Sequence, residues 1–244
     1  MSRTMPHRRP SAPALQLTRY AQAPLPTEYG DFQLFVYREL RAGVQAAHEH
    51  VAIVRGQVQE QHDVLVRVHS ECLTGEVLHS LKCDCRDQLD LALKRIAAVG
   101  RGAVLYLRQE GRGIGLGNKI RAYALQARGY DTVDANRALG FGDDLRRYDI
   151  AAGMLRDLGI ESVALMTNNP SKIEALRREG VHVLRRVEHT TAATPHSHHY
   201  LNTKRQRMGH LYAPVPAPSC ESIEAEHDAA ERDCCTLAAA SSAS

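Results

Sequence analysis

The sequence of 244 residues lacks several features that mark common classes of protein. No apolar run approaches the roughly 20 residues of a membrane-spanning helix, so no membrane partner is expected. Neither sign of charge predominates, because 31 basic and 28 acidic residues give a formal charge of +3. This balance argues against a nucleic-acid partner. Hydrophobic residues make up 43% of the chain, which is enough for a sizeable core.

Cysteines are few, and no secretory signal pattern precedes them. Six cysteines without such a signal do not predict a secreted disulfide framework. Reduced thiols fit a cytosolic compartment, so a cytoplasmic location is expected. Three of the six lie between residues 72 and 85, and the other three lie beyond residue 212.

Both ends of the chain lack the apolar periodicity of folded elements. Residues 1–14 combine three prolines with arginines, and residues 213–244 are rich in alanine, serine and acidic side chains. We predict a disordered arm and a disordered tail there. The predicted folded domain covers residues 15–212. It includes a polar loop, 190–199, whose histidines are more typical of solvated side chains than of a metal site.

Strand patterns and helix patterns alternate through much of this domain. Strands are expected at 32–37, 51–56, 64–69, 103–107, 162–166 and 181–184. Helices are expected around 89–97, 119–128, 150–158 and 170–180. The alternation predicts an α/β fold, in which ligands lie at the carboxyl ends of strands. Glu71, Glu110 and Thr167 all follow predicted strands.

Cys72, Cys83 and Cys85 form the first candidate site. Their spacing, C-x10-C-x-C, lacks the C-x2-C pairs of zinc ribbons and knuckles. Three thiolates with an open fourth position are a donor set of catalytic zinc. Three reduced thiols packed as small hydrophobic side chains would give the same pattern. Spacing alone favours the two interpretations about equally.

A glycine-rich loop at residues 111–119 is the second candidate site. Glycines let backbone amides approach an anion, and a helix N-terminus follows. No Ser or Thr follows Lys119, so the loop is not a Walker motif, and its spacing is not G-x-G-x-x-G. Taken alone, the loop is equally typical of a flexible turn.

Together these segments resemble GTP cyclohydrolase II, the enzyme that opens riboflavin biosynthesis. The resemblance is carried by residues 67–75, by Cys83-Asp84-Cys85 and by residues 108–116. Further similar segments follow in order at 118–123, 129–133, 167–170 and 204–210. The resemblance covers about residues 15–212. It implies a mixed sheet flanked by helices, a homodimer, and GTP as the substrate.

The resemblance also implies a reaction. Zinc on Cys72, Cys83 and Cys85 is expected to lower the pKa of water that attacks C8 of guanine. Hydrolysis would open the five-membered ring and release formate, with loss of pyrophosphate or phosphate. The expected product is 2,5-diamino-6-(5-phosphoribosylamino)pyrimidin-4(3H)-one. Mg²⁺ is expected at the substrate phosphates, whose hard oxygens suit it.

Three catalytic residues are implied, namely Tyr123 in the ring chemistry and Asp144 with Arg146 at the phosphates. The family mechanism makes Asp144 a proton acceptor and Arg146 a nucleophile on phosphorus. A guanidinium pKa above about 12 favours charge stabilisation by Arg146 instead. Asp143 and Arg147 are neighbours of the same types, so a shift of one residue stays open. Implied contacts with GTP are Arg67, Val68, His69, Ser70, Glu71, Gln88, Glu110, Gly111, Arg112, Thr132, Thr167 and Lys172.

Two alternatives stay open beside this interpretation. One is a zinc protein that holds a nucleotide without turning it over, which the presence of Tyr123, Asp144 and Arg146 disfavours. The other is a paralogue that opens GTP or a related purine in a specialised pathway. A formate assay would distinguish the first alternative from GTP cyclohydrolase II, and substrate competition would distinguish the second.

Overall fold

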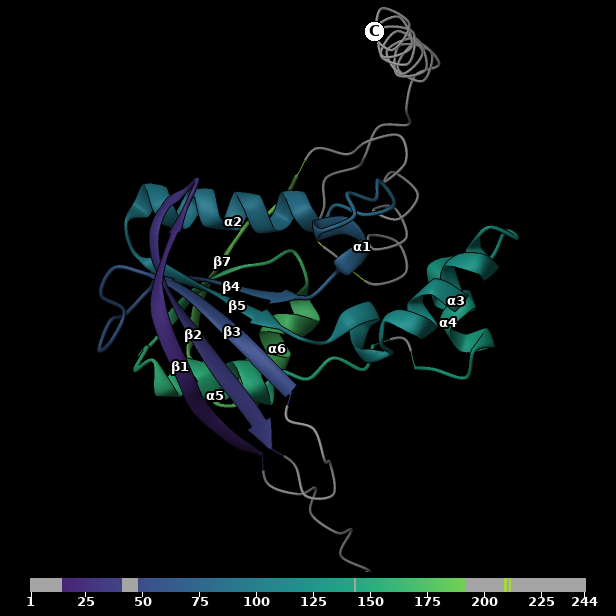
Figure 1. The fold of residues 1–244 in the computed structure, drawn as a ribbon. Coiled ribbons are helices and arrows are strands. Elements are labelled where there is room, and N and C mark those ends of the chain that lie inside the picture. The colour runs from purple at the N-terminus through teal and green to yellow at the C-terminus, as the bar shows by residue number, and fades with distance from the viewer. Residues whose placement is uncertain (1–14, 41–47, 143, 192–208, 210, 212–244) are drawn as a thin grey trace, which may run out of the picture.

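The computed structural model describes residues 15–40, 48–142, 144–191, 209 and 211. This part of the chain forms a seven-stranded sheet with the order β1-β2-β3-β5-β4-β6-β7 (Figure 1). The strands are β1 (Gln16–Thr27), β2 (Gly30–Leu40), β3 (His48–Arg55), β4 (Val64–Ser70), β5 (Gly102–Leu107), β6 (Val163–Met166) and β7 (Val183–Val187).

The two halves of the sheet differ in strand direction. β1, β2, β3 and β5 pair antiparallel, whereas β5, β4, β6 and β7 pair parallel. The sheet is therefore mixed, as predicted, and the alternating strand and helix pattern corresponds to its parallel half. Because parallel strands end at the same edge, the chain after β4, β5 and β6 emerges at one place.

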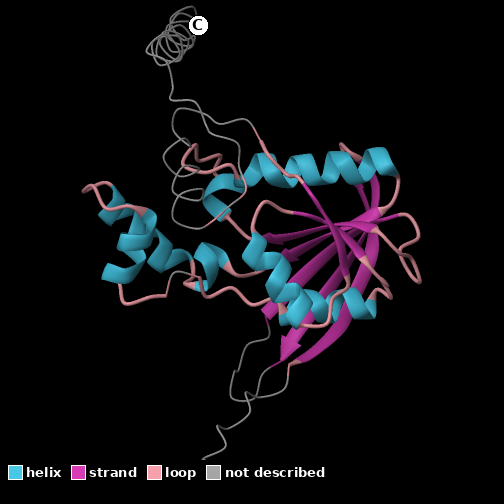
Figure 2. Cartoon of the chain, turned by 180° about the vertical axis from the view of Figure 1, so that it is seen from behind, coloured by secondary structure: helices cyan, strands magenta, loops and turns pink. Residues whose placement is uncertain are grey.

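Helices cover both faces of the sheet (Figure 1, Figure 2). On one face Ile96 of α2 packs with Val104 and Met166. On the other face Met154 and Leu176, from α5 and α6, pack in the larger core cluster. The helices are α1 (Leu73–Glu76), α2 (Cys85–Val99), α3 (Leu116–Gln126), α4 (Thr132–Ala138), α5 (Asp149–Asp157) and α6 (Pro170–Arg178), with a 3₁₀ turn, η1 (Glu110–Gly113).

The predicted strands and helices are present, with bounds shifted by a few residues, but β1, α1, η1 and α4 escaped the sequence patterns. Strand β1 pairs with β2 from the turn at Thr27 and Gly30 onward. Most of its side chains are exposed, and Pro24 and Pro26 interrupt its sequence, which an edge strand tolerates. Helix α4 is short, and Asp131 caps it by accepting hydrogen bonds from two backbone amides.

Several predictions fall on residues 1–14, 192–208 and 212–244. These lie outside the described part of the chain, so the disordered arm, the disordered tail and most of the polar loop stay predictions. Within the described part, no helix combines the length and the apolar character needed to cross a membrane.

Candidate active site

The carboxyl ends of β4, β5 and β6 open into a cavity of about 460 Å³. This volume lies in the range of about 300–1,000 Å³ that is common for small-molecule sites. Helices α2, α3 and α6 complete the wall. Most of the predicted site residues line it, namely Arg67, His69, Ser70, Glu71, Cys72, Cys83, Cys85, Gln88, Glu110, Gly111, Arg112, Tyr123, Arg146, Thr167 and Lys172.

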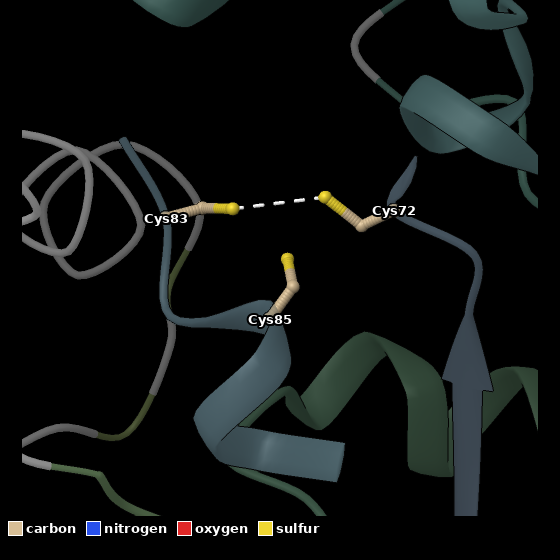
Figure 3. Close-up of side chains that lie close together, drawn as sticks. All are labelled: Cys72, Cys83 and Cys85. Atoms are coloured by element: carbon tan, nitrogen blue, oxygen red, sulfur yellow. Dashed lines mark hydrogen bonds between the residues drawn. The ribbon is translucent and has the colours of Figure 1, made fainter. Parts of the chain in front are cut away.

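Three thiols converge on one side of this cavity (Figure 3). Cys72 follows β4, Cys85 begins α2, and Cys83 lies just before it. The three sulfur atoms lie within 4.8 Å of one another, and those of Cys72 and Cys83 are 3.6 Å apart. Gly75 lies against the cluster, where an added β-carbon would be 2.9 Å from the sulfur of Cys83. A larger residue at position 75 would therefore displace the thiols.

The thiols shift one another's protonation. Hydrogen bonds from Cys83 and Cys85, together with the nearby Lys119 ammonium, lower the pKa of Cys72. Donation to Cys72 raises the pKa of Cys83 to about 11 and that of Cys85 well above its usual value. One thiolate and two thiols is thus the preferred state of the bare protein. Three converging sulfurs are a donor set that suits zinc, which would replace the remaining protons, so these residues fit the implied metal.

Lys119 lies against the thiols and is held by three acceptors. Its Nζ is 3.1 Å from the sulfur of Cys72, 2.9 Å from Oγ1 of Thr74 and 2.9 Å from Oε1 of Glu110. The other oxygen of Glu110 accepts a 2.7 Å hydrogen bond from the backbone amide of Leu73. Burial alone would lower the pKa of Lys119, but Glu110 and Cys72 raise it overall, so the ammonium stays charged.

Tyr123 extends from α3 toward the same cluster. Its hydroxyl is 3.5 Å from Oγ1 of Thr74, and the ammonium groups of Lys82 and Lys119 lie 5.2 and 5.6 Å from its ring centroid. Burial raises the pKa of Tyr123 to about 12. The phenol therefore carries its proton at neutral pH and can donate a hydrogen bond beside the thiols.

Arg146 and Arg147 are adjacent in sequence, but their side chains lie in different parts of the structure. Arg146 lines the cavity, and its guanidinium holds both carboxylate oxygens of Asp144, with Nε 2.9 Å from Oδ1 and Nη2 2.5 Å from Oδ2. Arg147 binds Glu39 at 2.6 Å and also Asp149. Burial alone would raise the pKa of Asp144, but Arg146 lowers it overall, so Asp144 is a carboxylate at neutral pH. Asp143 lies outside the described residues.

Two buried cations lie in the wall formed by β4 and α6. Arg67 donates to the carbonyl of Met166 at 2.9 Å and to the side chain of Gln88. Lys172 donates to the carbonyl of Val68 at 2.7 Å. Arg67 is 7% exposed and Lys172 is 4% exposed. Both cations line the cavity, where they can pair with the oxygens of a phosphate chain, so this part of the wall suits such a ligand.

Two of the predicted contacts are placed differently from the rest. The side chain of Val68 is fully buried in the core, and only its carbonyl oxygen serves the wall, through Lys172. Thr132 is the first residue of α4, and its side chain lies outside the described part of the structure.

The sequence interpretation missed several lining residues, of which His189 is the most buried. Its Nε2 lies 2.8 Å from the carbonyl of Gln88, to which it donates, and its backbone amide donates to Asn168. Burial lowers the pKa of His189 to about 3, so the ring is neutral. Its position was a usable signal, because His189 is the second residue after β7 and Thr167, the first residue after β6, lines the same cavity. The other missed lining residues include Lys82, Tyr130, Asn136 and Asn168.

His69 also belongs to a pair that the sequence did not reveal. Its Nε2 is 2.7 Å from Glu76, whose other oxygen accepts a 2.5 Å hydrogen bond from Tyr106. Burial, the largest effect, lowers the pKa of His69, so a neutral ring donates to the Glu76 carboxylate. The carboxylate thereby fixes the tautomer of His69 in the cavity wall.

Comparisons with known proteins agree with this geometry. A family model described as GTP cyclohydrolase II matches residues 18–188. GTP cyclohydrolase-2 of Shigella boydii serotype 18 is 53% identical over 197 residues, covering 81% of this chain and 98% of that protein. The riboflavin biosynthesis protein RibBA of Chlamydia trachomatis serovar D is 50% identical over 220 residues, covering 90% of this chain and 50% of that protein.

Among solved structures, RibBX of A. baumannii, a two-domain 3,4-dihydroxy-2-butanone 4-phosphate synthase, is similar over 70% of this chain and 40% of that one. The TM-score is 0.37 and the identity 21%, which is too distant to add to the assignment. The family model, which spans most of the chain, and the relatives at 50% identity or more are sufficient. By these matches, the chain belongs to the GTP cyclohydrolase II family.

Proposed function

We propose that this chain hydrolyses GTP to 2,5-diamino-6-(5-phosphoribosylamino)pyrimidin-4(3H)-one, formate and pyrophosphate or phosphate, as the first step of riboflavin biosynthesis. The observation that supports this best is the cavity, where three thiols and a phenol meet on one side and buried cations on another. A purine nucleotide needs both, because its ring must be opened and its phosphates must be held.

Cys72, Cys83 and Cys85 are the residues that would hold zinc. When bound there, the ion would supply a Lewis acid that activates water for attack at C8 of guanine. The phenol of Tyr123, protonated at neutral pH, would donate a hydrogen bond to an oxygen on the same carbon. Opening the ring leaves a formamide, and Tyr123 would steady its oxygen during the second hydrolysis.

The phosphates are assigned to the cationic part of the wall. Arg67, Arg112, Arg146 and Lys172 would bind the triphosphate, and Mg²⁺ would accompany it on the phosphate oxygens. Asp144 holds Arg146 in a fixed orientation. Since the pKa of Asp144 is lowered, it is a weak base, and we assign it the orientation of Arg146, which stabilises charge at the phosphorus being cleaved.

We also propose that the enzyme acts as a cytoplasmic homodimer. The support for the homodimer is the resemblance of the sequence, and the support for the cytoplasm is the set of reduced thiols in the site. Gel filtration with light scattering would measure the mass of the assembly, and a monomer at micromolar concentration would contradict this part of the proposal.

The test of the proposed reaction is incubation of the purified chain with GTP and Mg²⁺. Formate should be released, the pyrimidinone product should appear by mass spectrometry, and metal analysis should find one zinc per chain. Parallel incubations with ATP or ITP in place of GTP test whether the substrate is a related purine. Failure to release formate from GTP by a zinc-loaded, folded protein would overturn the proposal, and faster release from another purine would favour the specialised paralogue.

A further inference from the structure

Lys119 joins two parts of the site that the proposed mechanism uses separately. An ammonium has three N–H donors. In this protein they match three acceptors, namely the sulfur of Cys72, the hydroxyl of Thr74 and the carboxylate of Glu110, all within 3.1 Å. The same ammonium lies 5.6 Å from the ring centroid of Tyr123. Its side chain is 11% exposed, so water competes little for these bonds.

The location of Lys119 after a glycine-rich loop suggests a phosphate ligand. The contacts argue against that role, because a phosphate would have to displace one of three short hydrogen bonds. Glu110, one of these acceptors, is itself held in place. Its other carboxylate oxygen accepts a hydrogen bond from the backbone amide of Leu73, the first residue of α1. Helices α1 and α3 are thereby tied together at the thiols.

We propose that Lys119 is a positioning residue that holds the sulfur of Cys72 and the phenol of Tyr123 in one hydrogen-bonded unit, with Thr74 as the link. This inference rests on the proposed function, which supplies the roles of zinc and Tyr123. Because the Thr74 oxygen accepts from Lys119, its own proton is directed elsewhere, and both the Tyr123 oxygen at 3.5 Å and the Cys72 sulfur at 3.7 Å lie near it.

Two consequences follow from this arrangement. A cation beside Cys72 offsets part of the negative charge of three thiolates, which stabilises them as ligands. The hydroxyl of Thr74 fixes where the phenol points relative to those ligands. Loss of an outer hydrogen-bond partner of a metal ligand typically costs about 10- to 100-fold in metal affinity or activity. Lys119, the charged partner 3.1 Å from the Cys72 sulfur, should therefore affect metal binding more, whereas Thr74, whose hydroxyl lies 3.7 Å from the same sulfur, should affect the ring chemistry more.

The first experiment measures zinc affinity of Lys119→Met by competition with a chromogenic chelator. We expect about 10- to 100-fold weaker binding than in the parent chain. Cobalt substitution gives a second readout, because the sulfur-to-cobalt charge-transfer band should shift when the Cys72 sulfur loses its donor. The control is Arg121→Met, two residues further along α3, where the exposed side chain bonds Asn118 and should leave both readouts unchanged.

Removing Lys119 also leaves the Glu110 carboxylate near the thiolates, and a double variant separates this effect. Lys119→Met with Glu110→Gln should still bind zinc more weakly than Glu110→Gln alone, because the donor to Cys72 is missing in the double variant only. Lys119→Arg keeps the charge and should recover part of the affinity. It also carries the test if Lys119→Met does not fold, since its wider guanidinium should still weaken zinc binding measurably.

Thr74→Val removes the link while keeping the volume and the charge of the site. This variant should lose less zinc affinity than Lys119→Met, and it should accumulate the ring-opened formyl compound, seen by mass spectrometry. Parent-like zinc affinity and cobalt spectrum in Lys119→Met, or parent-like formate release in Thr74→Val, would overturn the inference. The metal readouts need no turnover, so a parent chain that releases no formate would refute the proposed function and leave the test of Lys119 readable.

Discussion

In the described part of the chain, the parallel half of the sheet contributes to the cavity wall, whereas the antiparallel half does not. Strands β4, β5 and β6 are short and buried, and the chain after each one enters the cavity. Strands β1, β2 and β3 are mostly longer, and among the described residues they contribute nothing to the cavity wall. The antiparallel half supports the site from behind, because Glu39 of β2 binds Arg147, the neighbour of Arg146.

This difference teaches that strand direction, more than burial, decides where chemistry gathers. His50 of β3 is as buried as His189, yet it is used inside the scaffold, where it contacts Glu39 and accepts from the amide of Arg108. His189 follows a parallel strand and faces the site edge. Substitutions in the two halves should therefore differ in kind, with loss of chemistry in one and loss of support in the other.

The largest effect is expected from Cys83→Ser, which removes a sulfur from the parallel half. Zinc affinity should fall by more than the roughly 100-fold that an outer partner of a metal ligand costs, and formate release should be lost with it. Metal analysis and a formate assay measure the two. Ser80→Ala in the same turn is the control, and zinc content equal to the parent's in Cys83→Ser would contradict the assignment.

A smaller loss is expected from Tyr123→Phe, which keeps the ring but removes the hydroxyl. Removing one positioned group in acid–base catalysis costs about 10²- to 10⁴-fold, so formate release should slow by that order while zinc stays bound. The ring-opened formyl compound should accumulate and be visible by mass spectrometry. Formate release at the parent rate would make Tyr123 a packing residue.

Arg147→Met tests the support that the antiparallel half provides. It leaves the buried Glu39 without its 2.6 Å partner, which should cost about 1 to 3 kcal/mol in the free energy of unfolding. Misplacement of the adjacent Arg146 should lower kcat by up to roughly 100-fold, with zinc content unchanged. Urea unfolding and steady-state kinetics measure these effects.

The matched control for that variant is Arg38→Met, in an exposed pair with Glu49 on β2 and β3. An exposed ion pair contributes about 1 kcal/mol or less, so this variant should unfold and turn over nearly as the parent does. Equal losses in the two variants would show that the support is spread through the antiparallel half and is not concentrated at Arg147.

The last effect concerns pH and His189, and it is the smallest at neutral pH, where the ring is mostly neutral in both the folded and the unfolded chain. Its pKa in the folded protein is about 3, below the ordinary 6.5, so the unfolded chain binds a proton that the native chain does not between these values. Stability should therefore fall as pH drops from about 6.5 toward 3. In His189→Gln the slope of the free energy of unfolding against pH should decrease by at most about 1.4 kcal/mol per pH unit, which corresponds to one proton. Urea unfolding with a chelator present measures it, and identical slopes would refute the prediction.

Much of the fold could be predicted because local patterns and tertiary structure agree there. The run from Val64 to His69 is apolar enough to read as a buried strand, and it delivers Cys72 to the edge as expected. Strand β1 could not be found this way. Its polar residues and prolines give no alternation, and its conformation comes from pairing with β2, which is a tertiary effect.

The site was predicted best where sequence order fixes the contacts and worst where distant partners decide. Nothing local tells which of Arg146 and Arg147 faces the cavity, because the deciding partner of Arg147, Glu39, is 108 residues away. Likewise Lys119 suggests phosphate binding from its loop, but Cys72, 47 residues earlier, fixes its actual orientation. The sequence therefore indicated which types of residue form the site, whereas the orientation of their side chains depends on the assembled sheet.

The thiol cluster also differs from the rest of the site in how much chain must be organised to form it. Cys72, Cys83 and Cys85 lie on one short segment, so bringing them together closes a small loop and costs little chain entropy. The contact between Arg67 and the carbonyl of Met166 spans 99 residues. During synthesis, a chain that has not yet reached β6 already holds all three cysteines of the proposed zinc site but has no closed wall for the nucleotide. Under that proposal, metal capture can precede substrate recognition in the life of each molecule.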